Sequence, residues 1–109
     1  MTVESLVKEI GLSVVCMPSP EREVNGAYVG DLLSWVMGKA EPDNVWITIM
    51  SNINIVAVAS LVDVSCVVLA EGVNPDEDAL NAALAKGINI LSTPQSAYSI
   101  AVAISGVIS

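Results

Sequence analysis

The chain has 109 residues, of which 53% are hydrophobic and 15% charged, and its net charge is −8. We predict one domain over residues 1–109, long enough to fold without a disulfide or a metal. The four basic residues, Lys8, Arg22, Lys39 and Lys86, are scattered, which argues against binding to nucleic acid or to an anionic membrane.

The N-terminal part predicts a helix and one or two strands. Thr2 suits the N-cap of a helix over residues 3–10, and Gly11 suits its end. Residues 13–17 are predicted to form a strand. Residues 23–28 are predicted to form a short second strand, at an edge of a sheet or within a turn.

The next helix is expected over residues 32–37. Asp31 suits its N-cap, and Gly38 suits its end. The spacing of the apolar residues predicts that Leu32, Leu33, Trp35 and Val36 face the core.

Residues 45–70 are apolar enough to resemble a membrane span, but polar residues, among them Asp63, interrupt them. A spanning helix would bury these groups in hydrocarbon at a cost of several kcal/mol. We therefore predict a buried strand over 45–50, a helix over 53–62 capped by Asn52, and a second buried strand over 64–70.

The last third repeats this alternation. Asn74 is expected to cap a helix with Pro75 in its first position, ending at Gly87. A short strand follows over 88–91, and Thr93 is expected to cap a final helix that continues to about residue 105. Strands that alternate with helices at short spacing are typical of an α/β fold with a mainly parallel sheet covered by helices.

Polar residues follow three of the predicted strands, where open parallel sheets usually bind ligands. Helix N-termini at such places attract anions, but the same residue types are also common helix caps. The candidate ligand-binding residues are Ser51, Asn52, Asn54, Ser92, Thr93 and Ser96.

The chain contains no histidine, the commonest general base and zinc ligand, and its acidic residues show no metal-binding spacing. Cys16 and Cys66 each lie in an apolar run, far apart, and are expected to be reduced thiols of a cytoplasmic protein. We therefore predict no enzymatic activity, no metal and no cofactor.

The segment from Glu21 to Asp31, Glu-Arg-Glu-Val-Asn-Gly-Ala-Tyr-Val-Gly-Asp, contains the single arginine, Arg22. Asn25 and Gly26 favour a turn, and Gly30 precedes the expected cap. Arg22 is expected to pair with Glu21, Glu23 or Asp31, to contact a second subunit, or to bind an anionic ligand.

This segment, continued through Leu32-Leu33, resembles the signature of the DRTGG domain family, as do residues 54–59 and 90–97. Glu21 stands where the family has aspartate, and Asn25-Gly26-Ala27 stands where Thr-Gly-Gly is typical. The resemblance implies a free-standing module similar to the non-catalytic N-terminal domain of HPr kinase/phosphorylase. It also implies a three-layer α/β/α sandwich that is commonly dimeric.

Two functions follow as hypotheses. The first is a regulatory module that senses a small ligand, such as an adenine nucleotide, at the carboxyl ends of the strands. The second is a structural or interaction module that docks on a partner enzyme. The large apolar fraction favours a homodimer in both cases.

Overall fold

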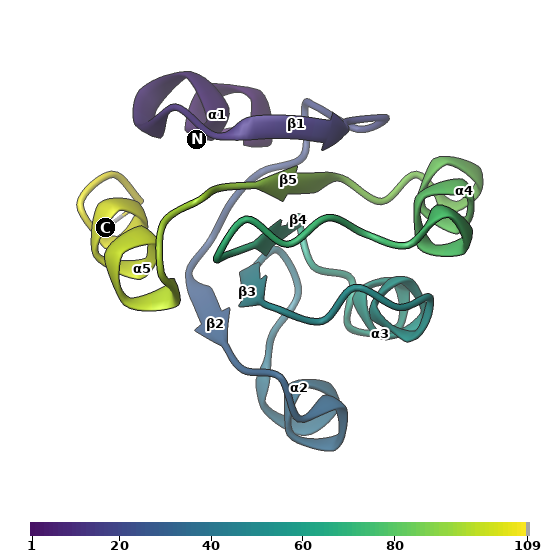
Figure 1. Ribbon diagram of the computed structural model, residues 1–109. Helices are drawn as coiled ribbons and strands as arrows, with labels where there is room; N and C mark the ends of the chain where they lie inside the picture. The colour runs from purple at the N-terminus through teal and green to yellow at the C-terminus, as the bar shows by residue number, and fades with distance from the viewer. Residues whose placement is uncertain (109) are drawn as a thin grey trace.

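The structure, a computed structural model, describes residues 1–108. Its five strands form one sheet in the order β1-β5-β4-β3-β2. Strands β2 to β5 are parallel, and β1 runs antiparallel to β5 at one edge (Figure 1). The strands are β1 (Ser13–Cys16), β2 (Ala27–Val29), β3 (Val45–Thr48), β4 (Cys66–Leu69) and β5 (Ile90–Ser92).

The structure has five helices. They cover the two faces of the sheet (Figure 1). Helices α2, α3 and α4 pack on one face, and α1 and α5 pack on the other. The helices are α1 (Val3–Ile10), α2 (Leu33–Lys39), α3 (Asn54–Val62), α4 (Glu77–Lys86) and α5 (Ala97–Ser105). The predicted three-layer α/β/α sandwich with a mainly parallel sheet is confirmed.

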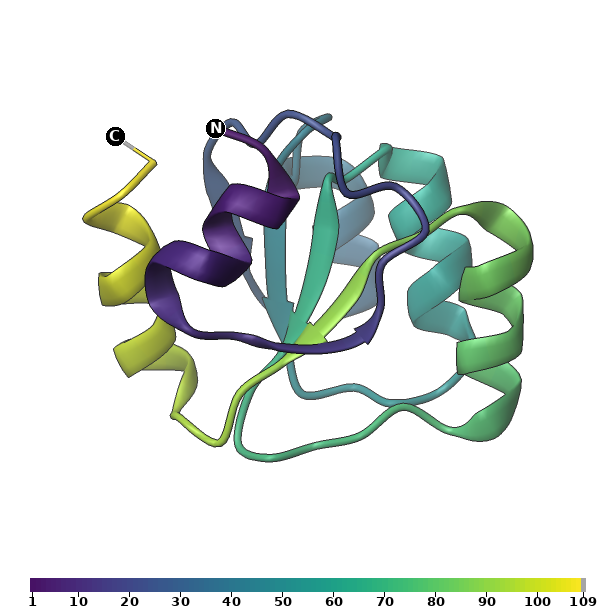
Figure 2. The same cartoon turned by 90° about the horizontal axis from the view of Figure 1, so that it is seen from above.

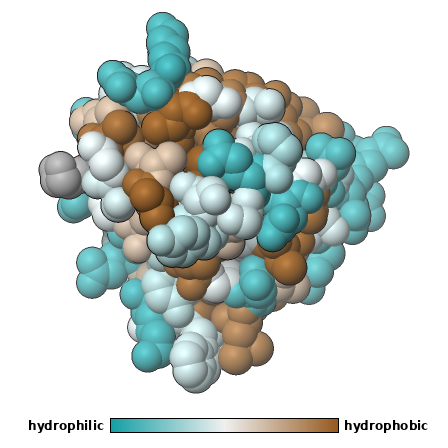
Figure 3. Space-filling view, turned by 60° about the vertical axis from the view of Figure 1, so that its left-hand side comes forward, coloured by the Kyte–Doolittle hydropathy of each residue, from teal (hydrophilic) through white to brown (hydrophobic). Residues whose placement is uncertain are grey.

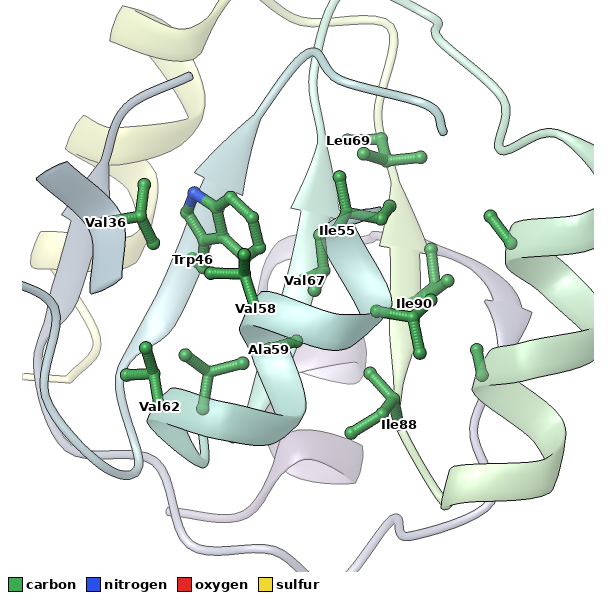
Figure 4. Close-up of a cluster of buried hydrophobic side chains, with 14 of the residues drawn as sticks. Val36, Trp46, Ile55, Val58, Ala59, Val62, Val67, Leu69, Ile88 and Ile90 are labelled. Atoms are coloured by element: carbon green, nitrogen blue, oxygen red, sulfur yellow. The ribbon is translucent and has the colours of Figure 1, made fainter. Parts of the chain in front are cut away.

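Alternate side chains of the central strands enter the two cores. From β3, Trp46 joins the core beneath α2, α3 and α4 (Figure 4), whereas Val45 and Ile47 join the core beneath α1 and α5. All four residues of β3 and of β4 are buried. Strands buried on both faces explain the continuous apolar runs of this segment.

The segment that resembled a membrane span folds as predicted into β3, α3 and β4. No helix within residues 1–108 has the length and apolar character needed to cross a membrane. Helix α1 also matches its prediction, because the Thr2 hydroxyl accepts a hydrogen bond from the Ser5 N–H at 3.2 Å. Gly11 ends the helix in a left-handed conformation.

Helix α2 differs from its prediction at both ends. Asp31 does not cap it, since the N-cap is Leu32 and no side chain accepts a hydrogen bond there. Gly38 lies inside the helix. Leu32 and Trp35 are 61% and 59% exposed, so the expectation that they face the core is wrong. Val36 is the buried residue of this seven-residue helix.

The caps of α3, α4 and α5 are also displaced along the chain. Helix α3 begins at Asn54, one residue after the predicted start. The Asn52 side chain accepts a hydrogen bond from the Asn54 N–H at 2.9 Å. Asn74 does not cap α4, which begins at Glu77 after Asp76. Ser96, not Thr93, caps α5 and accepts from the Ser99 N–H at 3.1 Å.

The predicted second strand is similarly displaced, because β2 covers residues 27–29 rather than 23–28. A short polar run offers several residues that can cap a helix, and propensity alone does not select among them. The same ambiguity affects the ends of a three-residue strand.

The two tryptophans give a direct test of the core. Trp46 is buried, and its indole N–H donates to the Gly30 carbonyl at 2.9 Å. We expect Trp46→Phe to lower the free energy of unfolding by about 2–4 kcal/mol, from the lost volume and the unpaired carbonyl. Trp35→Phe, at an exposed position, should change it by less than about 0.5 kcal/mol. Urea denaturation measures both, and equal losses would contradict this account of the core.

Candidate functional site

Strand β2 lies within the segment from Glu21 to Asp31, which we call the family-like segment, and separates its two ends onto opposite edges of the sheet. Arg22, Asn25 and Gly26 precede β2 and lie where β3 and β4 begin, which we call the amino edge. Gly30 and Asp31 follow β2 and lie where the parallel strands end, which we call the carboxyl edge. Figure 2 shows parallel strands of the sheet pointing toward the same edge. The segment is therefore not one loop that could surround a single ligand.

At the amino edge, Arg22 bridges two aspartates from different loops. Its guanidinium donates to an Asp43 carboxylate oxygen through Nη2 and to an Asp63 carboxylate oxygen through Nη1, both at 3.0 Å. Nη2 also donates to the Asp63 carbonyl at 2.9 Å. The prediction that Arg22 pairs with Glu21, Glu23 or Asp31 is therefore wrong. Arg22 does form ion pairs within the chain, but with Asp43 and Asp63.

Both aspartates adopt left-handed backbone conformations, with φ of 68° at Asp43 and 67° at Asp63. Asp63 ends α3, so Arg22 places a cation at the negative end of that helix. Burial lowers the pKa of Arg22, but the hydrogen bonds and charges of Asp43 and Asp63 outweigh burial and raise it above its ordinary value. The guanidinium is thus committed to contacts within the chain.

Two buried asparagines that were not predicted extend this amino-edge network. Asn44 accepts from the Glu41 N–H at 2.9 Å and donates to the Asn25 carbonyl at 2.8 Å. Asn89 donates to the carbonyls of Ser19 and Ser65 and accepts from the Ser19 N–H. Within residues 1–108, every buried side-chain nitrogen or oxygen has such a partner. The network is structural, because no buried polar group there is left over for a ligand.

The two glycines of the segment serve local packing. Gly26 has φ of 72°, and a Cβ there would lie 3.0 Å from Nδ2 of Asn44. At Gly30 a Cβ would lie 3.0 Å from Cε2 of the Tyr28 ring. The turn predicted at Asn25-Gly26 is not present, because neither residue lies in a turn or a bend. Gly26 still needs to be glycine for its left-handed backbone, whereas Gly30 makes room for the tyrosine.

At the carboxyl edge, Asp31 binds the end of β3 instead of α2. One carboxylate oxygen of Asp31 accepts from the Thr48 hydroxyl at 2.7 Å and from the Ile49 N–H at 3.0 Å. Asp31 thus fixes the start of the β3–α3 loop, which carries Ser51 and Asn52 and leads to Asn54, the first residue of α3. The sequence shows no local signal for this contact, because Asp31 and Thr48 lie 17 residues apart.

The candidate ligand-binding residues form two groups. One group is the β3–α3 loop, and the other is the β5–α5 connection with Ser92, Thr93 and Ser96. The β4–α4 loop, residues 70–76, is hydrogen-bonded to both of them. The Asp76 N–H donates to the Ser51 carbonyl at 2.9 Å, and the Gly72 N–H donates to the Thr93 carbonyl at 2.9 Å. Thr93 is 4% exposed, whereas the other five candidates are partly or fully exposed.

Several helix N-terminal donors at this edge already have partners. In α3, the N–H groups of Asn54, Ile55 and Val56 donate within the chain. In α4, Glu77 and Asp78 place negative charge in the first turn. The basic residues lie outside these loops: Arg22 is at the amino edge, Lys39 and Lys86 end α2 and α4, and Lys8 is in the last turn of α1, which leads to the start of β1 beside Ser92. The loops after β3, β4 and β5 therefore offer hydroxyl and amide groups and carry no basic residue of their own.

The thiols show no sign of an activated nucleophile. Cys16 and Cys66 are free and buried, as predicted, and burial raises the pKa of both. For Cys66 it reaches about 12, so this thiol stays protonated at neutral pH. Among residues 1–108, no three His, Cys, Asp or Glu side chains are placed to hold a metal ion. An open depression of about 360 Å³ is lined by Ser5, Lys8 and Glu9 of α1.

The family model of the DRTGG domain matches residues 5–107, nearly the whole sequence. The chain belongs to the DRTGG domain family. Among curated proteins, none matches the sequence. The resemblance seen in the sequence is thus confirmed. In this DRTGG domain, the two ends of the family-like segment lie at opposite edges of the sheet.

A solved structure with a similar fold comes from Clostridium perfringens. It contains the CBS and DRTGG domains of the regulatory region of a pyrophosphatase, complexed with the activator diadenosine tetraphosphate. The TM-score is 0.70 at 12% sequence identity, and the match covers 94% of this chain and 45% of that chain. This DRTGG domain thus spans less than half of the neighbour, and the likeness shows the fold.

Removing the guanidinium tests whether Arg22 is structural. We expect Arg22→Ala to lower the free energy of unfolding by about 1–3 kcal/mol, because three hydrogen bonds are lost. Lys8→Ala removes an exposed pair with Glu4 and should cost less than about 0.5 kcal/mol. Urea denaturation gives both values. An unchanged stability in Arg22→Ala would contradict the structural role.

The Cys66 thiol predicts a pH dependence. An unfolded thiol loses its proton near its ordinary pKa of 9.0, whereas Cys66 keeps it to about 12 in the folded chain. Above pH 9 the unfolded state binds fewer protons, so stability falls as pH rises, by up to about 1.4 kcal/mol per pH unit. Urea denaturation between pH 8 and 11 should show a shallower fall in Cys66→Ala than in the wild type. Parallel curves would contradict this prediction.

Proposed function

We propose that this DRTGG domain is a non-catalytic, dimeric regulatory module that senses a small ligand, such as an adenine nucleotide, at the carboxyl edge. The observation that carries the proposal is the polar rim itself. The accessible residues of this rim lie at or just after the carboxyl ends of parallel strands of one sheet: Ser51, Asn52, Asn54, Ser92 and Ser96. The solved neighbour supports it by analogy, because that regulatory region is complexed with a dinucleotide activator.

The charges of the rim narrow the kind of ligand. The rim carries no basic residue, and Asp31, Glu71, Asp76 and Glu77 lie on or beside its loops. A polyphosphate would therefore meet acidic groups without a compensating cation. Amide and hydroxyl groups suit the edge of a base or the hydroxyls of a ribose. We infer that the nucleoside part supplies most of the affinity, with at most a weak contribution from phosphate.

The second candidate function is an interaction module that docks on a partner enzyme without a small ligand. Exposed apolar side chains beside Asp31 favour it: Leu32 is 61% exposed, Ile49 46% and Ile53 49%. These residues lie on the connections after β2 and β3, at the same carboxyl edge. Apolar side chains gathered at one edge are typical of a protein contact. Reduced, buried thiols fit a cytoplasmic module in either case.

A nucleotide panel tests the ligand hypothesis. We expect calorimetry and thermal unfolding with adenosine, AMP, ATP and diadenosine tetraphosphate to detect binding. At 100 times the dissociation constant, a ligand should raise the free energy of unfolding by about 2.7 kcal/mol. Because the rim has no cation, AMP should bind at least as tightly as ATP. The absence of both heat and thermal shift across the panel would remove the ligand hypothesis.

A matched pair of substitutions locates the site. Asn54→Ala removes an exposed amide at the rim, whereas Asn81→Ala removes an exposed amide on α4. We expect the first to weaken binding by about fivefold or more, as for a lost hydrogen bond, and the second to leave it unchanged. Equal affinities in the two variants would place the ligand elsewhere. If no ligand binds, capture of a specific enzyme from the native host would support the interaction module.

A further inference from the structure

The two edge strands of the sheet differ in how they are protected. The register of β1 shifts between Val14 and Cys16, and Pro18 and Pro20 follow this strand. A bulge and nearby prolines protect an edge from pairing with another strand. Strand β2 has neither, and its sequence Ala27-Tyr28-Val29 contains no charge. Within residues 1–108, no segment pairs with the outer side of β2.

The backbone groups on the outer side of β2 can be identified. Toward β3, the Gly26 carbonyl accepts from the Val45 N–H at 3.0 Å, and the Gly30 N–H donates to the Ile47 carbonyl at 3.1 Å. Successive residues of a strand point their backbone groups to opposite sides. Ala27 and Val29 therefore direct N–H and C=O groups away from the sheet, and their side chains are exposed as well, Val29 by 50%.

We propose that two copies of this chain pair through β2, antiparallel, about a two-fold axis at Tyr28, so that their sheets join into one. This inference deepens the dimeric part of the proposed function and rests on it. Ala27 of each chain exchanges two hydrogen bonds with Val29 of the partner subunit, which gives four bonds in total. A two-fold axis makes the contact self-complementary and closes the assembly at two copies.

The bonds already made at the ends of β2 select this register. A shift centred on Ala27 would need the backbone of Asn25. Its N–H already donates to the Asp43 carbonyl at 2.9 Å, and its carbonyl accepts from Asn44. A shift centred on Val29 would extend the pairing to Asp31, where the chain bends away toward α2. The Tyr28-centred register uses only the three residues of the strand.

The residues around Tyr28 are nearly symmetric in sequence, and this register uses the symmetry. Gly26 and Gly30 flank Tyr28 at equal spacing, followed by Asn25 and Asp31. About the axis, Gly26 lies opposite Gly30 of the partner subunit. Neither glycine places a side chain at the ends of the contact.

The surroundings of β2 leave room for a second strand. Viewed along the strands, α5 lies to one side of β2 and α2 to the other, and no element lies beyond β2 (Figure 1). Figure 3 turns the side with α5 forward and shows apolar patches among hydrophilic side chains. Tyr98 and Val102 of α5, four residues apart, are 79% and 54% exposed. A partner at the β2 edge would cover apolar surface next to this helix.

Paired charges test the register. In A27K/V29K, like charges face each other across the axis, whereas in A27K/V29E each lysine faces a glutamate of the partner subunit. We expect wild type and A27K/V29E to sediment as dimers in analytical ultracentrifugation. A27K/V29K should have a dimer dissociation constant about tenfold higher or more than that of A27K/V29E. Circular dichroism confirms that both variants, changed only at exposed positions, are folded.

A cysteine cross-link gives an independent measurement. Tyr28→Cys places two thiols opposite each other at the axis, close enough for a disulfide. Leu61→Cys, 71% exposed on α3, is the control. Under mild oxidation, we expect a covalent dimer in the first variant and none in the second. Equal cross-linking in the two variants would count against the β2 edge.

The outcomes separate the parts of the proposal. A dimeric wild type in which A27K/V29K and A27K/V29E associate equally would overturn the β2 interface and leave the dimeric module standing. A monomeric wild type would overturn both the interface and dimerism. Ligand binding is read by calorimetry on the wild type, so its failure is distinguishable from either of these results.

Discussion

The bridge from Arg22 to Asp43 and Asp63 determines how the parallel part of the sheet begins. Asp43 lies just before β3, and Asp63 lies between α3 and β4, so one guanidinium holds the starts of two central strands together. The backbone of Arg22 also ties down the N-terminus, because its carbonyl accepts from the Val3 N–H at 2.9 Å. Arginine suits this role because its planar group donates to several acceptors at once.

The side chains of the amino edge are held by hydrogen bonds, whereas those of the carboxyl edge are less constrained. The loops that follow β3, β4 and β5 contact one another mainly through backbone hydrogen bonds, such as Glu71 N–H to the Gln95 carbonyl at 2.8 Å. Such bonds place few constraints on side-chain identity, so the exposed positions of these loops can change without loss of the fold. This difference between the two edges is one reason why we propose the carboxyl edge, and not the amino edge, as the ligand site.

The sequence predicted those features that depend on neighbouring residues. Helix α1 has one N-cap candidate and one terminal glycine, and β3 and β4 are uninterrupted apolar runs, so their type and place were foreseeable. Contacts between distant residues were not. Arg22 meets Asp63 across 41 positions, and nothing near either residue indicates the other. In the sequence, Asp63 is an acidic residue within an apolar stretch. In the fold, its ion pair with Arg22 explains why an acidic residue stands there.

The positions of the candidate site and of the departures from the family pattern likewise depend on contacts between distant residues. Glu21 and Asn25-Gly26-Ala27 lie at the amino edge or within β2. These departures from the family pattern are therefore apart from the carboxyl edge, where we propose that a ligand binds. The six candidate residues lie outside the segment from Glu21 to Asp31, after or at the ends of β3 and β5, and residues 70–76 are hydrogen-bonded to both groups. A ligand that contacts both groups of candidate residues must lie across the β4–α4 loop, residues 70–76. The shape of this loop therefore limits which ligands can bind, and residue types alone do not reveal that limit.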